Sequence, residues 1–323
     1  MDIRKYVGYA VHLMMLSMSH LLKPLESGLA FKFGEKGIEK YPPVFIIGAP
    51  RCGSTLLYKI LTERFEFTYF NNFTARFFEV PICGMFLNRL LGIKSLAGNY
   101  SFDYGNMQGL GAPNECGEFW YRWFSRPPHV YVEPGTTPAK KLNHIRWEIG
   151  GMEAVTRRPI LFKNLYNSMR IAPIAKAIPN ALFLVMRRDM GDTALSILKG
   201  RMRNNHSREE WWSLPPKEFS SLKNCRWDEQ ITGQVVHIYR QIEADRNRFG
   251  EERFFDVSYE EFCMDVHSVV GKIEQFFHGH GLNIRGHGDI PKRFPIMGVN
   301  GIVADDRVQL LETIDTMQLG PKK

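Results

Sequence analysis

Residues 44–57 read Val44-Phe45-Ile46-Ile47-Gly48-Ala49-Pro50-Arg51-Cys52-Gly53-Ser54-Thr55-Leu56-Leu57, and this segment carries the strongest structural signal in the chain. Its first four residues are continuously apolar, which is typical of a strand covered on both faces of a parallel sheet. A glycine-containing turn follows, and a helix is expected from about Ser54, with apolar residues on one side. The segment therefore predicts a strand, a loop and a helix in direct succession.

The loop between this strand and this helix has the features of an anion site. A helix N-terminus offers unpaired backbone N–H groups and the positive end of the helix dipole, and Gly48 and Gly53 let the backbone approach a ligand closely. The spacing resembles a Walker A loop, but Ser54 stands where that loop has its lysine. The cation is instead Arg51, inside the loop, which argues against hydrolysis of ATP or GTP.

The loop resembles the donor-binding loop of sulfotransferases that use 3′-phosphoadenosine 5′-phosphosulfate (PAPS). The pattern of that family is Pro, then Lys or Arg, then Ser-Gly-Thr/Ser-Thr, and here Cys52 replaces the more common Ser. The resemblance implies that Arg51 stabilises the bridging oxygen as it leaves and that Ser54 and Thr55 bind the 5′-phosphate. It implies donor contacts from the whole loop: Arg51, Cys52, Gly53, Ser54, Thr55 and Leu56.

A second signature of that family binds the 3′-phosphate of the donor. It consists of an Arg at the end of a strand and a Ser eight residues later on the next helix, which here are Arg188 and Ser196. A guanidinium fork suits phosphate oxygens. Arg187 is the alternative for the same role, and the spacing favours Arg188.

Weaker matches extend the resemblance over about 44–62 and 160–280. Residues 160–164 resemble the strand that bacterial members place before their 3′-phosphate strand, and residues 257–262 resemble a Tyr-Glu-Asp-Leu segment that would bring Tyr259 to the donor. Family members also close a basic C-terminal loop over the 3′-phosphate, for which the candidates are Arg285, Lys292 and Arg293.

The catalytic base is less clear from the sequence. Some family members carry a Glu about twenty residues past the loop, but residues 71–76 contain none. The candidates are Glu115 and Glu118, whose spacing favours one helix face, with His129 and His144 as weaker alternatives. Lys163 is a candidate for steadying the transferred group.

The rest of the chain alternates between the two types of element. Strands are expected at 159–163, 181–186 and 254–257, and helices at about 168–177, 228–248 and 259–278. This order predicts an α/β fold with a central parallel β-sheet flanked by helices, and the resemblance implies the P-loop-NTPase-like sulfotransferase form of it. We expect an N-terminal helical segment at 1–40 and a sulfotransferase domain at 41–323, with 66–158 as an acceptor-binding insertion.

The charge and the cysteine content of the chain limit the kinds of ligand and partner that we expect. A net charge of +8 fits an anionic ligand or a membrane surface, and the absence of a polybasic run argues against nucleic acid. The five cysteines form no metal-binding or disulfide pattern, so we expect reduced thiols, a cytoplasmic protein and no metal.

The N-terminus is apolar from Tyr6 to Met18 and is shorter than the ~20 residues that span a bilayer. We expect a helix that ends near Lys23-Pro24 and packs on the domain. An interfacial helix that brings residues 1–23 into peripheral contact with a membrane is the alternative.

Together these features predict transfer of a sulfuryl group from PAPS to a hydroxyl or amine of a glycan, lipid or small metabolite, with release of 3′,5′-ADP (PAP). The alternatives are a P-loop-type nucleotide kinase or NTPase, and a non-catalytic, membrane-associated nucleotide-binding module. The acceptor and the oligomeric state stay open.

Overall fold

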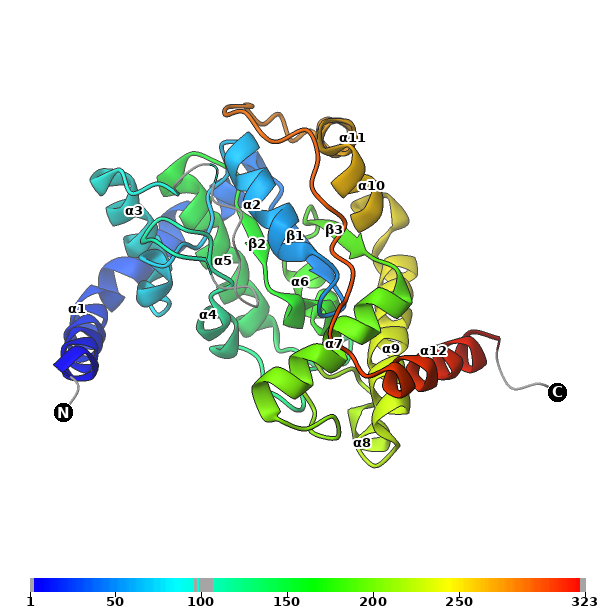
Figure 1. Ribbon diagram of the computed structural model, residues 1–323. Coiled ribbons are helices and arrows are strands. Elements are labelled where there is room, and N and C mark those ends of the chain that lie inside the picture. The colour runs from blue at the N-terminus through cyan, green and yellow to red at the C-terminus, as the bar shows by residue number, and fades with distance from the viewer. Residues whose placement is uncertain (1–2, 96–97, 99–106, 320–323) are drawn as a thin grey trace.

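The computed structural model describes residues 3–95, 98 and 107–319. Its centre is a parallel sheet in the order β2-β1-β3-β4 (Figure 1), with strands β1 Val44–Gly48, β2 Leu161–Lys163, β3 Leu182–Arg187 and β4 Phe254–Ser258. These strands overlap those expected from the apolar runs, and the α/β class with a central parallel sheet flanked by helices is confirmed.

Helices cover both faces of the sheet, and each face has its own apolar cluster. On one face lie α2 Ser54–Arg64, α10 Tyr259–Met264 and α11 Val266–Gly279. On the other lie α5 Ala139–Thr156, α6 Ile171–Ala177, α7 Met190–Asn205, α9 Trp227–Phe249 and α12 Ala304–Leu319. The remaining elements are α3 Pro81–Leu91, α4 Gly117–Tyr121, α8 Phe219–Leu222, η1 Thr74–Phe77, η2 Leu165–Met169 and η3 Glu251–Arg253.

A row of phenylalanines crosses the sheet and joins its four strands. Phe45 stacks on Phe162 and Phe183, with ring centroids 5.0 Å and 5.5 Å away, and Phe183 stacks on Phe254 at 4.7 Å. Trp120 of α4 packs against Phe162 at 5.1 Å. The region between residues 66 and 158 therefore shares its core with the sheet.

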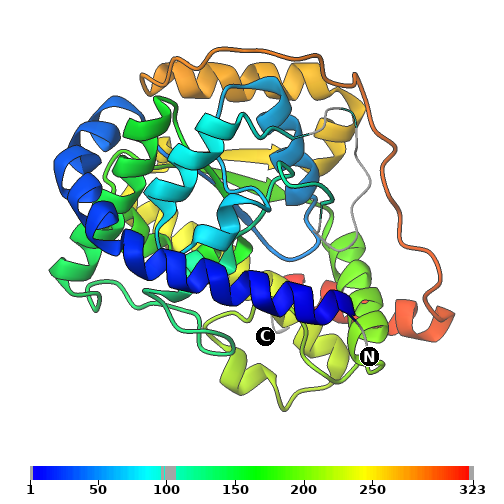
Figure 2. The ribbon, with the colours of Figure 1, turned by 90° about the vertical axis from the view of Figure 1, so that its left-hand side faces the viewer.

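The expected end of the first helix near Lys23-Pro24 is wrong. Helix α1 runs from Ile3 to Lys40 and contains Pro24, and it changes direction between its two halves (Figure 2), as helices do at proline. The second half packs closely on α5, and the Glu26 carboxylate accepts hydrogen bonds from the backbone N–H groups of Ile82 and Cys83 at 2.7 Å and 2.9 Å. These tertiary contacts outweigh the local cost of proline.

Two other helix predictions need correction in detail. The helix expected over 259–278 is split at Asp265, whose side chain accepts a hydrogen bond from Ser268 N and so starts α11. The helix expected over 168–177 is a 3₁₀ turn followed by α6. Within the described residues, no helix combines the length and apolarity needed to cross a bilayer.

The contact between α1 and α5 gives a stability prediction. A Cβ on Gly37 would lie 1.8 Å from the carbonyl oxygen of Gly150, whereas a Cβ on Gly28 of the same helix would meet no atom within 4 Å. We expect Gly37→Ala to lower the free energy of unfolding by about 1–3 kcal/mol, because backbone must move. Gly28→Ala should raise it by up to about 1 kcal/mol through helix propensity. Thermal unfolding measures both, and equal effects would contradict the close packing.

Candidate active site

The loop after β1 is held in a conformation that requires its glycines. Gly53 has φ 92° and immediately precedes α2. A Cβ on Gly53 would lie 2.4 Å from the ring of Tyr259, so the close approach of Tyr259 depends on a glycine here. Gly48 at the other end of the loop exchanges two hydrogen bonds of 3.0 Å with the Ser168 hydroxyl. Ser168 was not predicted from the sequence, because its partner Gly48 lies 120 positions away.

The first turn of α2 has no side-chain cap, because its N-cap is Gly53. The backbone N–H groups at a helix N-terminus need acceptors, and an anion satisfies both these groups and the helix dipole. Ser54 and Thr55 begin this turn, as the sequence predicts.

The second motif lies directly against the loop. Arg51 Nε donates a 3.0 Å hydrogen bond to Ser196 Oγ, and Arg188 Nη1 donates one of 3.2 Å to the Arg51 carbonyl. The Arg188 guanidinium also stacks over the Tyr259 ring at 4.6 Å. Residues separated by up to 208 positions, from Arg51 to Tyr259, thus form one cluster.

Arg187, the alternative to Arg188, is directed elsewhere. Its guanidinium pairs with Asp256 and Glu243 and stacks over the Tyr239 ring at 5.0 Å. The alternation of side chains along β3 separates the two arginines. The geometry therefore favours Arg188 for contact with the loop.

A buried lysine and a carboxylate meet at the end of β2. Lys163 is only 4% exposed, and its ammonium pairs with the Glu115 carboxylate. Asn164 Nδ2 donates to the Glu115 carbonyl at 3.3 Å, which holds the backbone beside the strand. Burial raises the pKa of the Cys52 thiol, and the nearby positive charge of Lys163 opposes that shift. Lys163 is also paired with Ile46 in the sheet register, two residues before the end of β1, so the Lys163–Glu115 pair lies beside the strand that leads into the loop.

The prediction that Glu115 and Glu118 share a helix face is wrong. Cys116 has φ 43°, and α4 begins only at Gly117, so Glu115 precedes the helix. The Glu118 carboxylate instead forms an exposed pair with Arg126, through contacts of 3.0 Å and 2.5 Å. Only Glu115 of the two is paired with the buried lysine.

The two histidine candidates lie in other contacts. His144 Nε2 is 3.0 Å from the Glu148 carboxylate on the same helix. The ring of His129 packs edge-on against Phe219. Neither contact involves the loop, Lys163 or Arg188.

The C-terminal segment reaches the cluster through residues that the sequence did not single out. Arg188 Nη2 donates to the Met297 carbonyl, and Met297 N donates to the Tyr259 hydroxyl at 3.3 Å. Lys199, one helical turn after Ser196, donates to the Asn300 carbonyl at 3.0 Å. The candidates Arg285, Lys292 and Arg293 lie before this part of the segment. The one available signal was the pair of glycines at 298 and 301, which marks a loop.

The chain was compared with models of protein families and with curated proteins. The model of the "Sulfotransferase family" matches residues 42–279. No curated protein matches the chain.

Solved structures of bacterial sulfotransferases resemble the chain at low sequence identity. Sulfotransferase STF1 from Mycobacterium tuberculosis has a TM-score of 0.51 at 14% identity, over 79% of this chain and 73% of that one. STF9 from Mycobacterium avium has a TM-score of 0.48 at 14% identity, over 88% and 69%. A sulfotransferase from Alicyclobacillus acidocaldarius has a TM-score of 0.45 at 17% identity, over 85% and 91%.

The first of these structures has the same fold, and the family match spans the strand, the loop, the Arg188 motif and Tyr259. The chain therefore belongs to the sulfotransferase family and is a sulfotransferase.

Proposed function

We propose that the protein transfers a sulfuryl group from PAPS to an acceptor hydroxyl and releases 3′,5′-ADP. The observation that carries this proposal is the meeting of Arg51, Ser196 and Arg188 through hydrogen bonds of 3.0 Å and 3.2 Å. The loop would bind a 5′-phosphate, and Arg188 beside it would bind a second phosphate, which fits a 3′,5′-bisphosphate nucleotide. A nucleoside triphosphate carries no 3′-phosphate for Arg188 to bind.

In this proposal the donor lies across the start of α2. The backbone N–H groups of the first turn and the hydroxyls of Ser54 and Thr55 bind the 5′-phosphosulfate, with Cys52, Gly53 and Leu56 completing the loop. Arg188 and Ser196 bind the 3′-phosphate. Arg188 donates to the carbonyls of Arg51 and Met297 and lies 3.7 Å from the Asp192 carboxylate. A phosphate is a stronger acceptor than either carbonyl for the same guanidinium. The Tyr259 ring supports both Arg188 and Gly53.

Transfer itself is an in-line displacement at sulfur. The acceptor oxygen forms a bond to sulfur, and the bond from sulfur to the bridging oxygen of the donor breaks. The Glu115 carboxylate takes the acceptor proton. Arg51 stabilises the charge on the departing phosphate oxygen, and Lys163 turns from Glu115 to the sulfuryl oxygens. Since the electron pair leaves with 3′,5′-ADP, the step needs no oxidant or reductant.

We also propose a cellular location for the protein and a contact with a membrane. All five cysteines are free thiols, which fits a cytoplasmic protein. The apolar sequence of residues 6–18 fits peripheral contact with a membrane through residues 1–23. An acceptor of low molecular mass or the exposed end of a glycan or lipid fits the family.

The donor assignment can be tested with two neighbouring arginines. We expect Arg188→Ala to weaken binding of 3′,5′-ADP by about 10- to 100-fold, the effect of losing a charge-assisted hydrogen bond of about 1.5–3 kcal/mol. Arg187→Ala should leave the affinity within about twofold, since Arg187 pairs with Asp256 and Glu243. Isothermal titration calorimetry measures both dissociation constants. The opposite order would reject the assignment of the 3′-phosphate to Arg188.

A further inference from the structure

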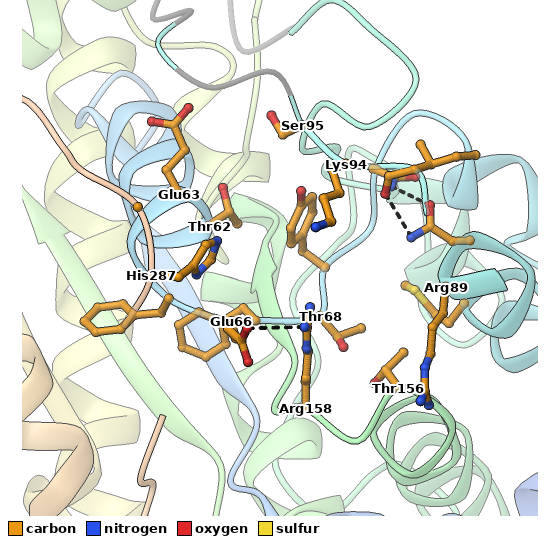
Figure 3. A pocket seen from close by; sticks show the side chains of 18 of the residues that line it. Thr62, Glu63, Glu66, Thr68, Arg89, Lys94, Ser95, Thr156, Arg158 and His287 are labelled. Carbon is orange, nitrogen blue, oxygen red and sulfur yellow. Dashed lines mark hydrogen bonds and ion pairs between the residues drawn. The ribbon is translucent and has the colours of Figure 1, made fainter. Parts of the chain in front are cut away.

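A cavity of about 600 Å³ lies at the other end of α2 from the donor loop (Figure 3). Helix α2 begins at Ser54, and the cavity begins at Thr62. Eight residues of α-helix advance by ~12 Å, so the cavity is separate from the start of the helix. Its volume falls within the range of roughly 300–1,000 Å³ that is typical of small-molecule sites.

The walls of this cavity come from four separate segments that are tied to one another. His287 N donates to the Arg64 carbonyl at 2.7 Å, which joins the C-terminal segment to α2. Arg89 Nη1 donates to the Val155 carbonyl at 2.7 Å, which joins α3 to α5. Thr68 N donates to the carbonyl of residue 159 at 2.8 Å. Because hydrogen bonds fix each wall, the cavity is preformed.

Part of the inner surface is apolar. The half-buried side chains of Tyr69 and Ile93 provide the apolar surface that a ligand can reach, and Phe65, Phe67 and Met85 lie behind it, only 0%, 4% and 2% exposed. Burial raises the pKa of Tyr69 to about 12. Tyr69 is therefore neutral near pH 7. The surface suits an aromatic or aliphatic body of a ligand.

Among the described residues that line the cavity, cationic side chains outnumber carboxylates. Lys94 and Arg157 line the cavity, and neither has a carboxylate partner within the described part of the chain. Arg158 lies 3.4 Å from Glu66, and Figure 3 shows Lys94 and Arg158 pointing toward one another across the cavity.

The acidic side chains do not cancel this charge. Glu63 is neutralised by Lys59 at 2.9 Å, and both are buried. Glu66 faces Arg158, which leaves Asp289 as the remaining carboxylate of the lining. The pKa of His287 is lowered, first by partial burial and then, against the effect of Glu66, by Arg158, Lys94 and Arg64.

The backbone conformation of Arg157 is unusual for a residue with a large side chain. Arg157 has φ 58° at the end of α5, a left-handed position that usually holds glycine. A large cationic side chain at this position carries a conformational cost. The residue with this strained conformation lines the cavity.

From these features we propose that the cavity binds an organic anion with an apolar body, at the same time as the nucleotide site is filled. A carboxylate, phosphate or sulfate group lies between Lys94, Arg157 and Arg158, and the apolar body lies on Tyr69 and Ile93. This proposal does not depend on the identity of the sulfuryl donor, since it concerns a different end of α2.

Calorimetric titration of the full chain with naphthalene sulfonate tests the proposal. We expect binding, and we expect Lys94→Glu and Arg157→Glu each to weaken it by about tenfold or more. Lys223→Glu makes the same charge change at an exposed lysine of another surface and should leave the affinity unchanged. Uncharged naphthalene methanol should bind at least about tenfold more weakly.

The same titrations with and without saturating 3′,5′-ADP locate the probe. An unchanged affinity for naphthalene sulfonate supports two separate sites, whereas competition places the probe in the nucleotide site and overturns the proposal. Absence of binding, equal weakening by Lys223→Glu, or equal affinity for the uncharged probe also overturns it. Binding of 3′,5′-ADP is read separately, so a failure of the donor assignment is distinguishable from a failure here.

Discussion

Glu115→Gln is expected to lower the rate of sulfuryl transfer by about a hundredfold to ten-thousandfold, the usual contribution of a general base. The amide keeps the shape of the side chain but cannot accept the acceptor proton. Binding of 3′,5′-ADP should change by less than about twofold, because Glu115 faces Lys163 and not Arg188. Initial rates with PAPS, followed by release of 3′,5′-ADP, measure the effect.

Glu118→Gln is the matched control for this variant. Glu118 lies three positions away and pairs with the exposed Arg126, so the rate should stay within about twofold of the wild type, as for other surface pairs of little energetic weight. Loss of activity in Glu118→Gln with retention in Glu115→Gln would show that Glu118, and not Glu115, takes the acceptor proton.

The second large effect is expected for Lys163→Met. Removing one electrostatic contact to a transition state costs about a hundredfold to a thousandfold in rate, and methionine keeps most of the volume of this 4%-exposed side chain. The affinity for 3′,5′-ADP should be nearly unchanged, because that product has no sulfuryl group. The rate constant for transfer and the dissociation constant of 3′,5′-ADP are measured on the same preparation.

A structural role for Lys163 would give a different pattern. If Lys163 only held Glu115 in place, Lys163→Arg would restore the rate, because arginine keeps the ion pair at a similar reach. Our account expects Lys163→Arg to remain at least about tenfold slow, since a planar guanidinium and a compact ammonium place their donors differently. Full recovery by Lys163→Arg would contradict it.

The sheet was predictable because its strands are short, apolar runs. Residues 44–47 and 181–186 are covered on both faces, and such strands need no alternation of polar residues. The loop and Arg188 were predictable for a different reason. Both were recognised from local spacing, first from Gly48 to Thr55 and then from Arg188 to Ser196.

The incorrect predictions share a dependence on distant contacts. Pro24 signals the end of a helix, yet Glu26 and the packing of Gly37 on Gly150 hold α1 together beyond it. The spacing of Glu115 and Glu118 indicates one helix face, yet Cys116 adopts a left-handed conformation between them. Neither effect is encoded in a window of a few residues.

Met297 and Ser168 illustrate the same limit within the site. Met297 contacts the cluster through its backbone, which any residue could supply, and Ser168 contacts it through a hydroxyl that belongs to no motif. Their roles follow from where the chain returns in space and not from a motif. Sequence spacing therefore predicted that the loop and the Arg188 motif lie together, and it did not predict the other segments that contact them.

The central claim is that the loop and Arg188 together form a site for a 3′,5′-bisphosphate nucleotide. Thermal unfolding with no ligand, with 3′,5′-ADP, and with ATP plus Mg²⁺ tests this claim most directly. At ~100 times its dissociation constant, 3′,5′-ADP should add about 2.7 kcal/mol to the free energy of unfolding, which raises the melting temperature by at least about 2 °C. Stabilisation by 3′,5′-ADP and not by ATP is the predicted result, and stabilisation by ATP with Mg²⁺ alone would contradict the account.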